Sequence, residues 1–282
     1  MAAVTAGPDR PRAAPVLGVG AGLAGPVRSE FTKLGSVRST YWTLILLVLA
    51  GLAWAVANCA GEAAHWATTP PAGRVGFDPT QASIVGLALL GQLVIVVLGA
   101  LTLTSEYSTG MIRTSLTVMP RRGVLYAAKA AVLVAVIGVV AAITSFAAFF
   151  TGQYLLRSTH VAATLSQPGV LRAVVATALY VVLSGLFAFG LGAIVRSTAG
   201  AMAMAYGLLF LIPQLAKALP SAWYADVQRW LPSGDVVNAI TRTQGGNAYP
   251  DLFSAWGEFA VFGAYTAVLL IIGALLFGRR DA

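Results

Sequence analysis

The chain has 282 residues, of which 58% are hydrophobic and only 10% are charged. Soluble domains carry about 25% charged residues, so this composition excludes a disordered chain, a coiled coil and an ordinary soluble enzyme, and it indicates an integral membrane protein. The single cysteine and the two histidines exclude an intrachain disulfide framework and a cysteine- or histidine-rich metal centre, so we expect no metal site.

The chain starts with residues 1–26, which are rich in Ala, Pro and Gly and contain no long apolar core. The first apolar core begins near Tyr41, too far along the chain for a secretory signal peptide. We therefore expect a disordered tail on the cytoplasmic side.

The next segment, residues 27–40, has the spacing of a short amphipathic helix. Phe31 and Leu34 fall on one helical face, whereas Lys33 and Arg38 lie mostly elsewhere. Such a helix lies at the membrane surface. The alternative is a solvated, charged lead-in to the first membrane span.

Six later stretches are long and apolar, and their cores lack Asp, Glu, Lys, Arg and His. A helix needs about 20 apolar residues to cross ~30 Å of hydrocarbon. The apolar character is continuous and does not alternate, which argues against a β-barrel. We predict an all-α membrane protein with a six-helix transmembrane domain over residues 41–278. The predicted spans are 41–61, 82–105, 129–156, 172–195, 197–217 and 257–278.

The basic residues predict the orientation of these spans. With both termini in the cytoplasm, the inner segments hold most of the Lys and Arg and carry the whole net charge of +8. The positive and negative charges of the outer segments then cancel. We interpret the positive charge as a topology signal and expect no nucleic-acid partner.

Few polar side chains interrupt the apolar cores. Gln92, Thr144 and Tyr206 could line a pathway, or they could hydrogen-bond between helices. Pro213, followed by Gln214, removes a backbone hydrogen bond within the fifth span and is expected to kink or break that helix.

The largest inner loop is predicted over residues 106–128. Its spacing favours a short capped helix that exposes Met111 and Leu116 and ends at Pro120. A helix of this kind, ringed by charge, is suited to dock in a partner's groove. A membrane-surface turn anchored by its arginines is an equal alternative.

The longest outer segment, residues 218–256, is aromatic and broken by prolines. Its large aromatic side chains include Trp223, Trp230, Phe253 and Trp256. This composition predicts short helices that dip into the outer leaflet. They could border an exit route for a hydrophobic substrate, or form an aromatic belt that only anchors the protein.

Several kinds of chemistry have no sequence signal. The chain has no phosphate-binding GxxxxGK[ST] motif and no HExxH motif, and the span cores hold no acid or base that could activate a serine. We therefore expect a protein that is not itself an enzyme. Ion-coupled carriers place ionisable groups near the membrane midplane, and none is present there, so any transport would draw its energy from elsewhere.

Two stretches resemble the permease subunits of bacterial ABC transporters, in the ABC-2 exporter class. The first is VRSEFTKLGSVRSTYWTL, entering the first span, and the second is SEYSTGMIRTSLTVMPRRGVLYAAK, following the second. The positions that carry the second resemblance are Glu106, Tyr107, Gly110, Arg113, Leu116, Thr117, Pro120, Arg121, Arg122, Ala128 and Lys129.

The resemblance implies a multi-pass subunit of the bacterial cytoplasmic membrane that pairs with a second permease and with two separate ATP-binding subunits. ATP and Mg would be bound by those partners and no cofactor by this chain. It assigns residues 27–38 as a connecting helix and 108–119 as a coupling helix, and implies re-entrant helices between the fifth and sixth spans. The implied coupling interface is Glu106, Tyr107, Gly110, Met111, Arg113, Leu116, Pro120, Arg121 and Arg122.

Other readings of the sequence remain. A membrane anchor or assembly subunit would use the same loop for docking without forming a pathway, and an ion-coupled secondary carrier would need a charge at the midplane. Lipid, drug, peptide and ion export all fit the sequence. So do a homodimer and a pair with a similar permease.

Overall fold

A computed structural model describes residues 24–111, 117, 121–228, 230–231, 234–243 and 254–279. Most of these residues are helical, the rest lie in turns and irregular connections, and the described part of the chain has no strand. Residues 1–23, the greater part of the predicted tail, lie outside this description. The elements are α1 (Ala24–Ser36), α2 (Arg38–His65), α3 (Pro71–Val75), α4 (Pro79–Ser108), α6 (Arg122–Leu155), the 3₁₀ turn η1 (Leu156–Thr159), α7 (Val170–Val195), α8 (Thr198–Tyr206), the π-helical turn η2 (Gly207–Leu211), α9 (Ile212–Ala216), α10 (Ser221–Gln228), α11 (Gly234–Thr241) and α12 (Ala255–Arg279).

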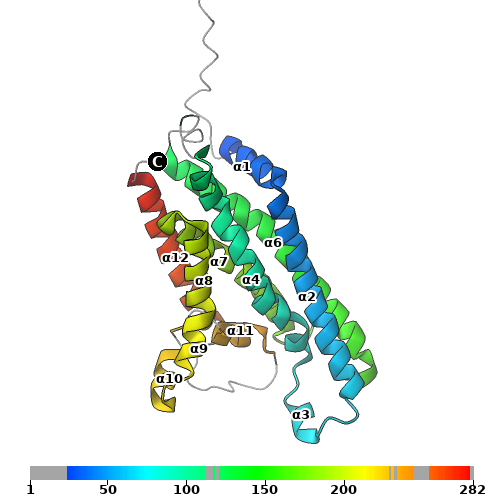
Figure 1. The fold of residues 1–282 in the computed structure, drawn as a ribbon. Coiled ribbons are helices and arrows are strands. Elements are labelled where there is room, and N and C mark those ends of the chain that lie inside the picture. Colours follow the sequence, from blue (N-terminus) through cyan, green and yellow to red (C-terminus); the bar gives the residue numbers. More distant parts are fainter. Residues whose placement is uncertain are drawn as a thin grey trace, which may run out of the picture.

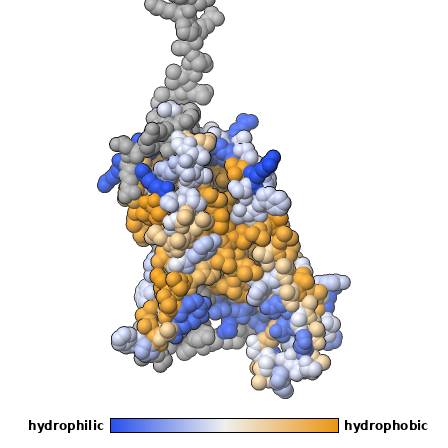
Figure 2. Space-filling view, viewed as in Figure 1, coloured by the Kyte–Doolittle hydropathy of each residue, from blue (hydrophilic) through white to orange (hydrophobic). Residues whose placement is uncertain are grey.

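Six helical rods among the described residues are long and apolar enough to cross a membrane, which confirms the predicted number of spans. They are α2, α4, α6 with η1, α7, the α8–η2–α9 segment, and α12. Figure 2 shows a hydrophobic band across the middle of the face in view, with hydrophilic residues gathered toward the two ends. The chain is thus built as a multi-pass membrane protein. We call the two ends the α1 end and the α11 end, after the short helices that lie there (Figure 1).

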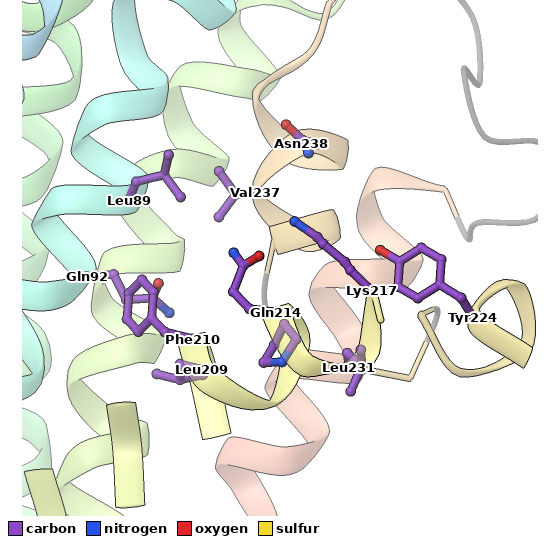
Figure 3. Close-up of a pocket in the computed structure, with 11 residues that line it drawn as sticks. Leu89, Gln92, Leu209, Phe210, Gln214, Lys217, Tyr224, Leu231, Val237 and Asn238 are labelled. Atoms are coloured by element: carbon purple, nitrogen blue, oxygen red, sulfur yellow. The ribbon is translucent and has the colours of Figure 1, made fainter. Parts of the chain in front are cut away.

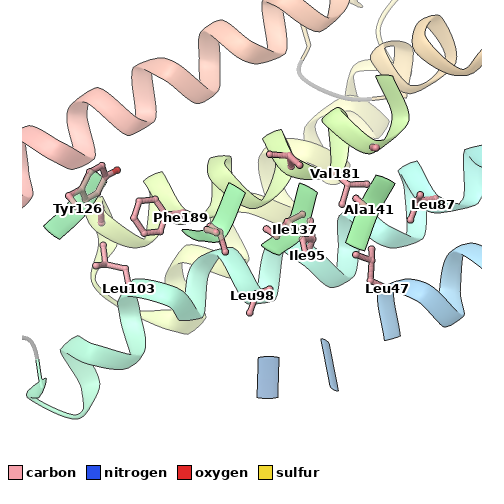
Figure 4. Close-up of a cluster of buried hydrophobic side chains, with 14 of the residues drawn as sticks. Leu47, Leu87, Ile95, Leu98, Leu103, Tyr126, Ile137, Ala141, Val181 and Phe189 are labelled. Atoms are coloured by element: carbon pink, nitrogen blue, oxygen red, sulfur yellow. The ribbon is translucent and has the colours of Figure 1, made fainter. Parts of the chain in front are cut away.

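The core of the bundle forms around α4 and α7. Leu47, Ile95, Ile137 and Phe189, from four different helices, are all fully buried in one cluster, part of which is drawn in Figure 4. Gly99 on α4 lies so close to α7 that a Cβ atom there would collide with the carbonyl oxygen of Gly185. Small residues permit such close approach in membranes, where packing must replace the hydrophobic effect between helices.

The amphipathic segment differs from the prediction at its end. The helix α1 stops at Ser36, and Val37 adopts an extended conformation (φ −88°, ψ 118°) before α2 begins. Arg38 therefore belongs to the first turn of α2 and not to the surface helix predicted over 27–40, because the extended residue turns the chain between two helices. Glu30 on α1 faces the bundle and is only 6% exposed, whereas Phe31 is 58% exposed.

The fifth span is irregular, as the proline predicts. The chain widens into the π turn η2 directly before α9, where the Ile212 N–H donates to the carbonyl of Gly207, five residues back. Pro213 follows at the start of α9. A proline cannot donate a backbone hydrogen bond, and its ring crowds the preceding turn, so a wider turn there accommodates it.

Two short helices, α10 and α11, lie within the predicted aromatic outer segment. The helix α11 crosses the bundle end (Figure 1) and buries Val236, Val237 and Ile240 against the cluster formed with α4, α7 and α12. Three predicted aromatic residues, Trp223, Trp230 and Trp256, are more than half exposed, at 67%, 55% and 53%. Phe253 lies outside the described residues.

Candidate functional site

Four charged side chains meet at the α1 end and form what we call the ionic cluster: Glu30 and Lys33 of α1, Glu106 of α4 and Lys129 of α6. The Lys129 Nζ donates to Glu30 Oε2 at 2.7 Å and to Glu106 Oε1 at 2.5 Å. The Lys33 Nζ donates to Glu30 Oε1 at 3.0 Å and to Glu106 Oε1 at 3.4 Å. The cluster thus ties α1 to two membrane-spanning helices.

The cluster is buried to different depths. The Lys129 side chain is 1% exposed, the two carboxylates 7% and 9%, and the Lys33 side chain 36%. Burial lowers the pKa of Lys33, but its hydrogen bond to Glu30 and the charges of Glu106 and Glu30 outweigh that effect, so the pKa lies above its ordinary value of 10.5. Lys33 is therefore fully charged at neutral pH.

The end of α4 is also connected to the turn between α7 and α8. The guanidinium of Arg196 lies 4.9 Å from the ring centre of Tyr107, and the hydroxyls of Thr104 and Thr198 are 2.8 Å apart. Arg196 has a left-handed backbone (φ 57°), which reverses the chain between the two helices. This one helix end therefore contacts α1, α6 and the α7–α8 turn.

A further bond joins α4 to α8 deeper in the bundle. The Tyr206 hydroxyl donates to the carbonyl oxygen of Leu93 at 2.6 Å. Tyr206 is the last residue of α8, directly before the π turn η2. The irregular part of the fifth span is thus held against the middle of α4.

Beyond this bond lies a cavity of about 90 Å³, which we call the α4–α9 cavity. Polar side chains from separate elements line it, including Gln92, Gln214, Lys217 and Asn238, which are labelled in Figure 3. The Gln92 Nε2 atom is buried and has no hydrogen-bond partner in the described part of the chain. A buried amide without a partner indicates a place where a water or a ligand oxygen would be favourable.

The wall of this cavity formed by α11 is clamped to the rest of the bundle. Asp78, before α4, accepts hydrogen bonds from the Thr243 N–H at 2.5 Å and from the Thr243 hydroxyl at 3.0 Å. Arg172 of α7 donates to the carbonyl oxygens of Ala239, at 3.3 Å, and Arg242, at 2.6 Å. The Arg172 bonds satisfy carbonyls at the end of α11, and the Asp78 bonds satisfy the Thr243 N–H and hydroxyl. Together they keep the helix across the bundle.

The structure brings together three of the five residues predicted to line a pathway. Gln92, Pro213 and Gln214 all border the α4–α9 cavity, and Tyr206 supports it from the neighbouring turn. Thr144 lies elsewhere. Its hydroxyl donates to the carbonyl of Val140 within α6, and its methyl group packs beside Gly51 of α2.

The residues predicted for the coupling interface divide into two groups. Glu106 and Tyr107 make contacts inside the chain, because α4 continues past the membrane-spanning core and packs against α1, α6 and the α7–α8 turn. Gly110 has a positive φ of 70° where α4 ends, and Met111 is 50% exposed after it. Arg121 precedes α6, and Arg122 begins it. Arg113, Leu116 and Pro120 lie outside the described residues.

Sequence reasoning missed the central part played by Glu30 and Lys129 in the ionic cluster, and by Asp78 and Arg172 at the other end. Lys129 is a single charge flanked by alanines at the edge of a long apolar run. A charge in that position is expected to find a buried partner, so this signal was available. Asp78 followed by Pro79 is likewise an N-cap pattern, and the Asp78 side chain does accept from Thr80 and Gln81.

Within the described ranges, no group of three or more His, Cys, Asp and Glu side chains could hold a metal ion. A scan against protein-family models found no match for this chain, and a search of curated proteins found no similar sequence.

Proposed function

We propose that this chain is the membrane-spanning permease subunit of an ATP-driven exporter of the ABC-2 class, working as a dimer with separate ATP-binding subunits. The observation that supports this most directly is the position of the end of α4. Through Glu106, Tyr107 and Thr104 it contacts α1, α6 and the α7–α8 turn, directly before the predicted coupling loop. A force applied to that loop would reach three parts of the bundle together.

The proposed orientation places the α1 end in the cytoplasm. Basic residues support it, since Arg28, Arg38, Arg121, Arg122 and Arg279 all belong to segments at or next to that end. Positive residues are retained on the cytoplasmic side of membrane proteins. The predicted coupling loop would then face the compartment that holds ATP.

In this proposal, closure of two ATP-binding subunits moves the loop, and α4 transmits the movement. The ionic cluster would move α1 and α6 together with α4, because leaving either carboxylate buried without Lys129 is unfavourable. Two hydrogen bonds between α4 and α8, Thr104–Thr198 and Tyr206–Leu93, would move α8 together with α4 as well. The α4–α9 cavity lies where these movements would meet the irregular fifth span.

The pathway itself is proposed to run between two permeases along the faces of the first, second and fifth spans. Gln214 is exposed on α9 next to Leu211 and Leu215, which are 59% and 62% exposed. An amide facing lipid is unfavourable, so this face is better suited to a second permease or a cargo. ATP and Mg would be bound entirely by the partner subunits.

The proposal is tested by expressing the tagged chain with its neighbouring genes and purifying it in mild detergent. We expect a subunit carrying a phosphate-binding loop motif to copurify in equal amount and to hydrolyse ATP. Met111→Asp should weaken this association, because it places a charge in the exposed apolar part of the loop. The matched control is Val75→Asp, an 88% exposed apolar residue in α3 between the first two spans, which should leave association and hydrolysis unchanged.

A chain that purifies alone and without ATP hydrolysis from its natively expressed operon would overturn the proposal. It would favour a membrane anchor or an ion-coupled carrier. If both aspartate variants lost the partner equally, the loop would not be assigned to the interface.

A further inference from the structure

The face of α2 that points away from the bundle carries its side chains in a definite order. Arg38, Trp42, Ile45 and Leu49 follow one another at steps of four, three and four residues, so they lie in one stripe along the helix. Val56 continues the stripe two turns further on. We call these five residues the α2 stripe.

Every member of the α2 stripe is exposed. Trp42 is 70% exposed, and Ile45, Leu49 and Val56 are 47%, 57% and 44% exposed. Arg38 is exposed as well. The helix α2 lies along one side of the bundle (Figure 1), and only 22% of its most apolar stretch is buried. An exposed apolar face of this length needs a cover other than water.

The apolar part of the α2 stripe has the length of one membrane leaflet. At a rise of 1.5 Å per residue, Ile45 and Val56 are about 16 Å apart along the helix axis, roughly half of the ~30 Å hydrocarbon core. Trp42 precedes them, and tryptophans concentrate at the membrane–water interface. Arg38 lies about 6 Å further out along the axis, at the depth of the lipid headgroups. The stripe therefore has the same order of charged, interfacial and apolar parts as a phospholipid.

Arg38 brings an uncompensated positive charge to this depth. It makes no hydrogen bond and no ion pair with the residues that the structure describes. The acid nearest to it in the sequence, Glu30, already accepts from Lys33 and Lys129. A guanidinium group binds phosphate through two parallel hydrogen bonds, and an exposed one is attracted to anionic headgroups.

We propose that the α2 stripe binds an anionic phospholipid from the leaflet at the α1 end. The lipid phosphate accepts from the Arg38 guanidinium, and an acyl chain lies along Ile45 and Leu49. A zwitterionic lipid offers the same chain, but the cation of its headgroup offsets the attraction between its phosphate and the arginine. The stripe therefore selects a lipid with net negative charge. This assignment stands whether or not the chain transports anything.

The experiment is photo-crosslinking of the purified full chain in vesicles of phosphatidylcholine. One probe is phosphatidylglycerol and the other is phosphatidylcholine, each at the same low amount and with the same diazirine-bearing acyl chain. Mass spectrometry of proteolytic fragments identifies the labelled positions. We expect labelling between Trp42 and Val56 to be about fivefold higher with phosphatidylglycerol, equivalent to ~1 kcal/mol, because one arginine at the membrane surface contributes about that much.

Two variants at Arg38 separate the effect of charge from the effect of shape. Arg38→Gln should reduce the preference to about onefold, whereas Arg38→Lys should keep most of it because the positive charge remains. Arg157→Gln is the matched control, since Arg157 is also exposed and follows the exposed residues Phe150 and Tyr154 at the other end of the bundle. It should leave the preference at the α2 stripe unchanged.

Equal labelling of the α2 stripe by the two probes would overturn the proposal, as would a preference that survives Arg38→Gln or that is lost equally in Arg157→Gln. A further outcome concerns the occupant. Ile143 and Phe150 of α6 are 65% and 55% exposed and report whether the probes reach the chain. If both probes label these residues and neither labels the α2 stripe, a protein such as a second copy of this chain covers that face, and the lipid assignment is wrong.

Discussion

Lys129 donates to Glu30 at 2.7 Å although 99 residues of sequence separate them. The bond joins the third membrane-spanning helix to a short helix that precedes the first. The same ammonium group also reaches Glu106 on the second span at 2.5 Å. One buried lysine therefore determines how three parts of the chain meet at the α1 end.

Replacing Lys129 by Met should be strongly destabilising. Removing one partner from a buried ion pair leaves the opposite charge uncompensated, and the loss is typically ~3–5 kcal/mol. Lys33→Met is the matched control, because its side chain is 36% exposed, and loss of an exposed pair should reduce stability by less than about 1 kcal/mol. Thermal unfolding of both variants in detergent measures the difference. Equal unfolding temperatures would contradict the assignment of Lys129 as the centre of the cluster.

Alkaline pH should release Lys33 of α1 from the ionic cluster. The pKa of Lys33 is raised above 10.5 in the folded chain. Its contribution to stability is therefore fully present below the ordinary lysine pKa and is lost as the pH rises through the higher folded value. An environment-sensitive fluorophore on Phe31→Cys should report this release, and native Cys59 is buried and should add little background labelling. In a chain that also carries Lys33→Met, a transition with the same onset would show that another group titrates.

Contact between α4 and α7 leaves no room for a side chain at Gly99. Gly99→Ala should destabilise the chain by about 1–3 kcal/mol, since the new methyl group would meet the backbone of Gly185. Gly138→Ala is the control, because its nearest neighbour, a methyl carbon of Val182, is 3.8 Å away from the added atom. That variant should be neutral or slightly stabilising. Equal effects in thermal unfolding would refute the close packing of these two helices.

Asp78→Asn should loosen α11. The neutral amide accepts more weakly from Thr243 and no longer attracts Arg172, and a hydrogen bond to a charged group contributes ~1.5–3 kcal/mol. Hydrogen–deuterium exchange of α11 should accelerate while exchange in α2 stays unchanged. Glu62→Gln is the control, because Glu62 is a half-buried carboxylate near the C-terminal end of α2. This variant should leave the exchange of α11 unchanged.

Cysteine labelling tests the proposed orientation. In intact cells, a membrane-impermeant maleimide should react with Val75→Cys and should reach Met111→Cys only after permeabilisation. Both positions are well exposed, at 88% and 50%, so accessibility of the side chain itself does not limit either reaction. The opposite labelling pattern would place the predicted coupling loop outside the cell and exclude its contact with an ATP-binding partner.

The six spans were predictable because length and apolar content alone decide whether a helix can cross a membrane. Gln92, Pro213 and Gln214 were recognisable for a related reason, since each is unusual within an apolar span. That they border one cavity depends on how α4 packs against the fifth span, and periodicity carries no such information.

The inner face of α1 was harder to foresee. An amphipathic surface helix is expected to keep Phe31 toward apolar surroundings and its charges toward water. Glu30 instead faces the bundle because Lys129, far along the chain, provides a buried partner. Pairings between distant residues of this kind become visible only once the helices are placed.

The ionic cluster also has a consequence for how the chain is made. Glu30 and Glu106 both leave the ribosome before Lys129, so neither carboxylate can acquire its buried partner until the third membrane helix has been synthesised. During that interval α1 can contact the second span only through the more exposed Lys33. Helix α1 therefore gains its buried ion pair only after the third span has been made, although it is synthesised before the first.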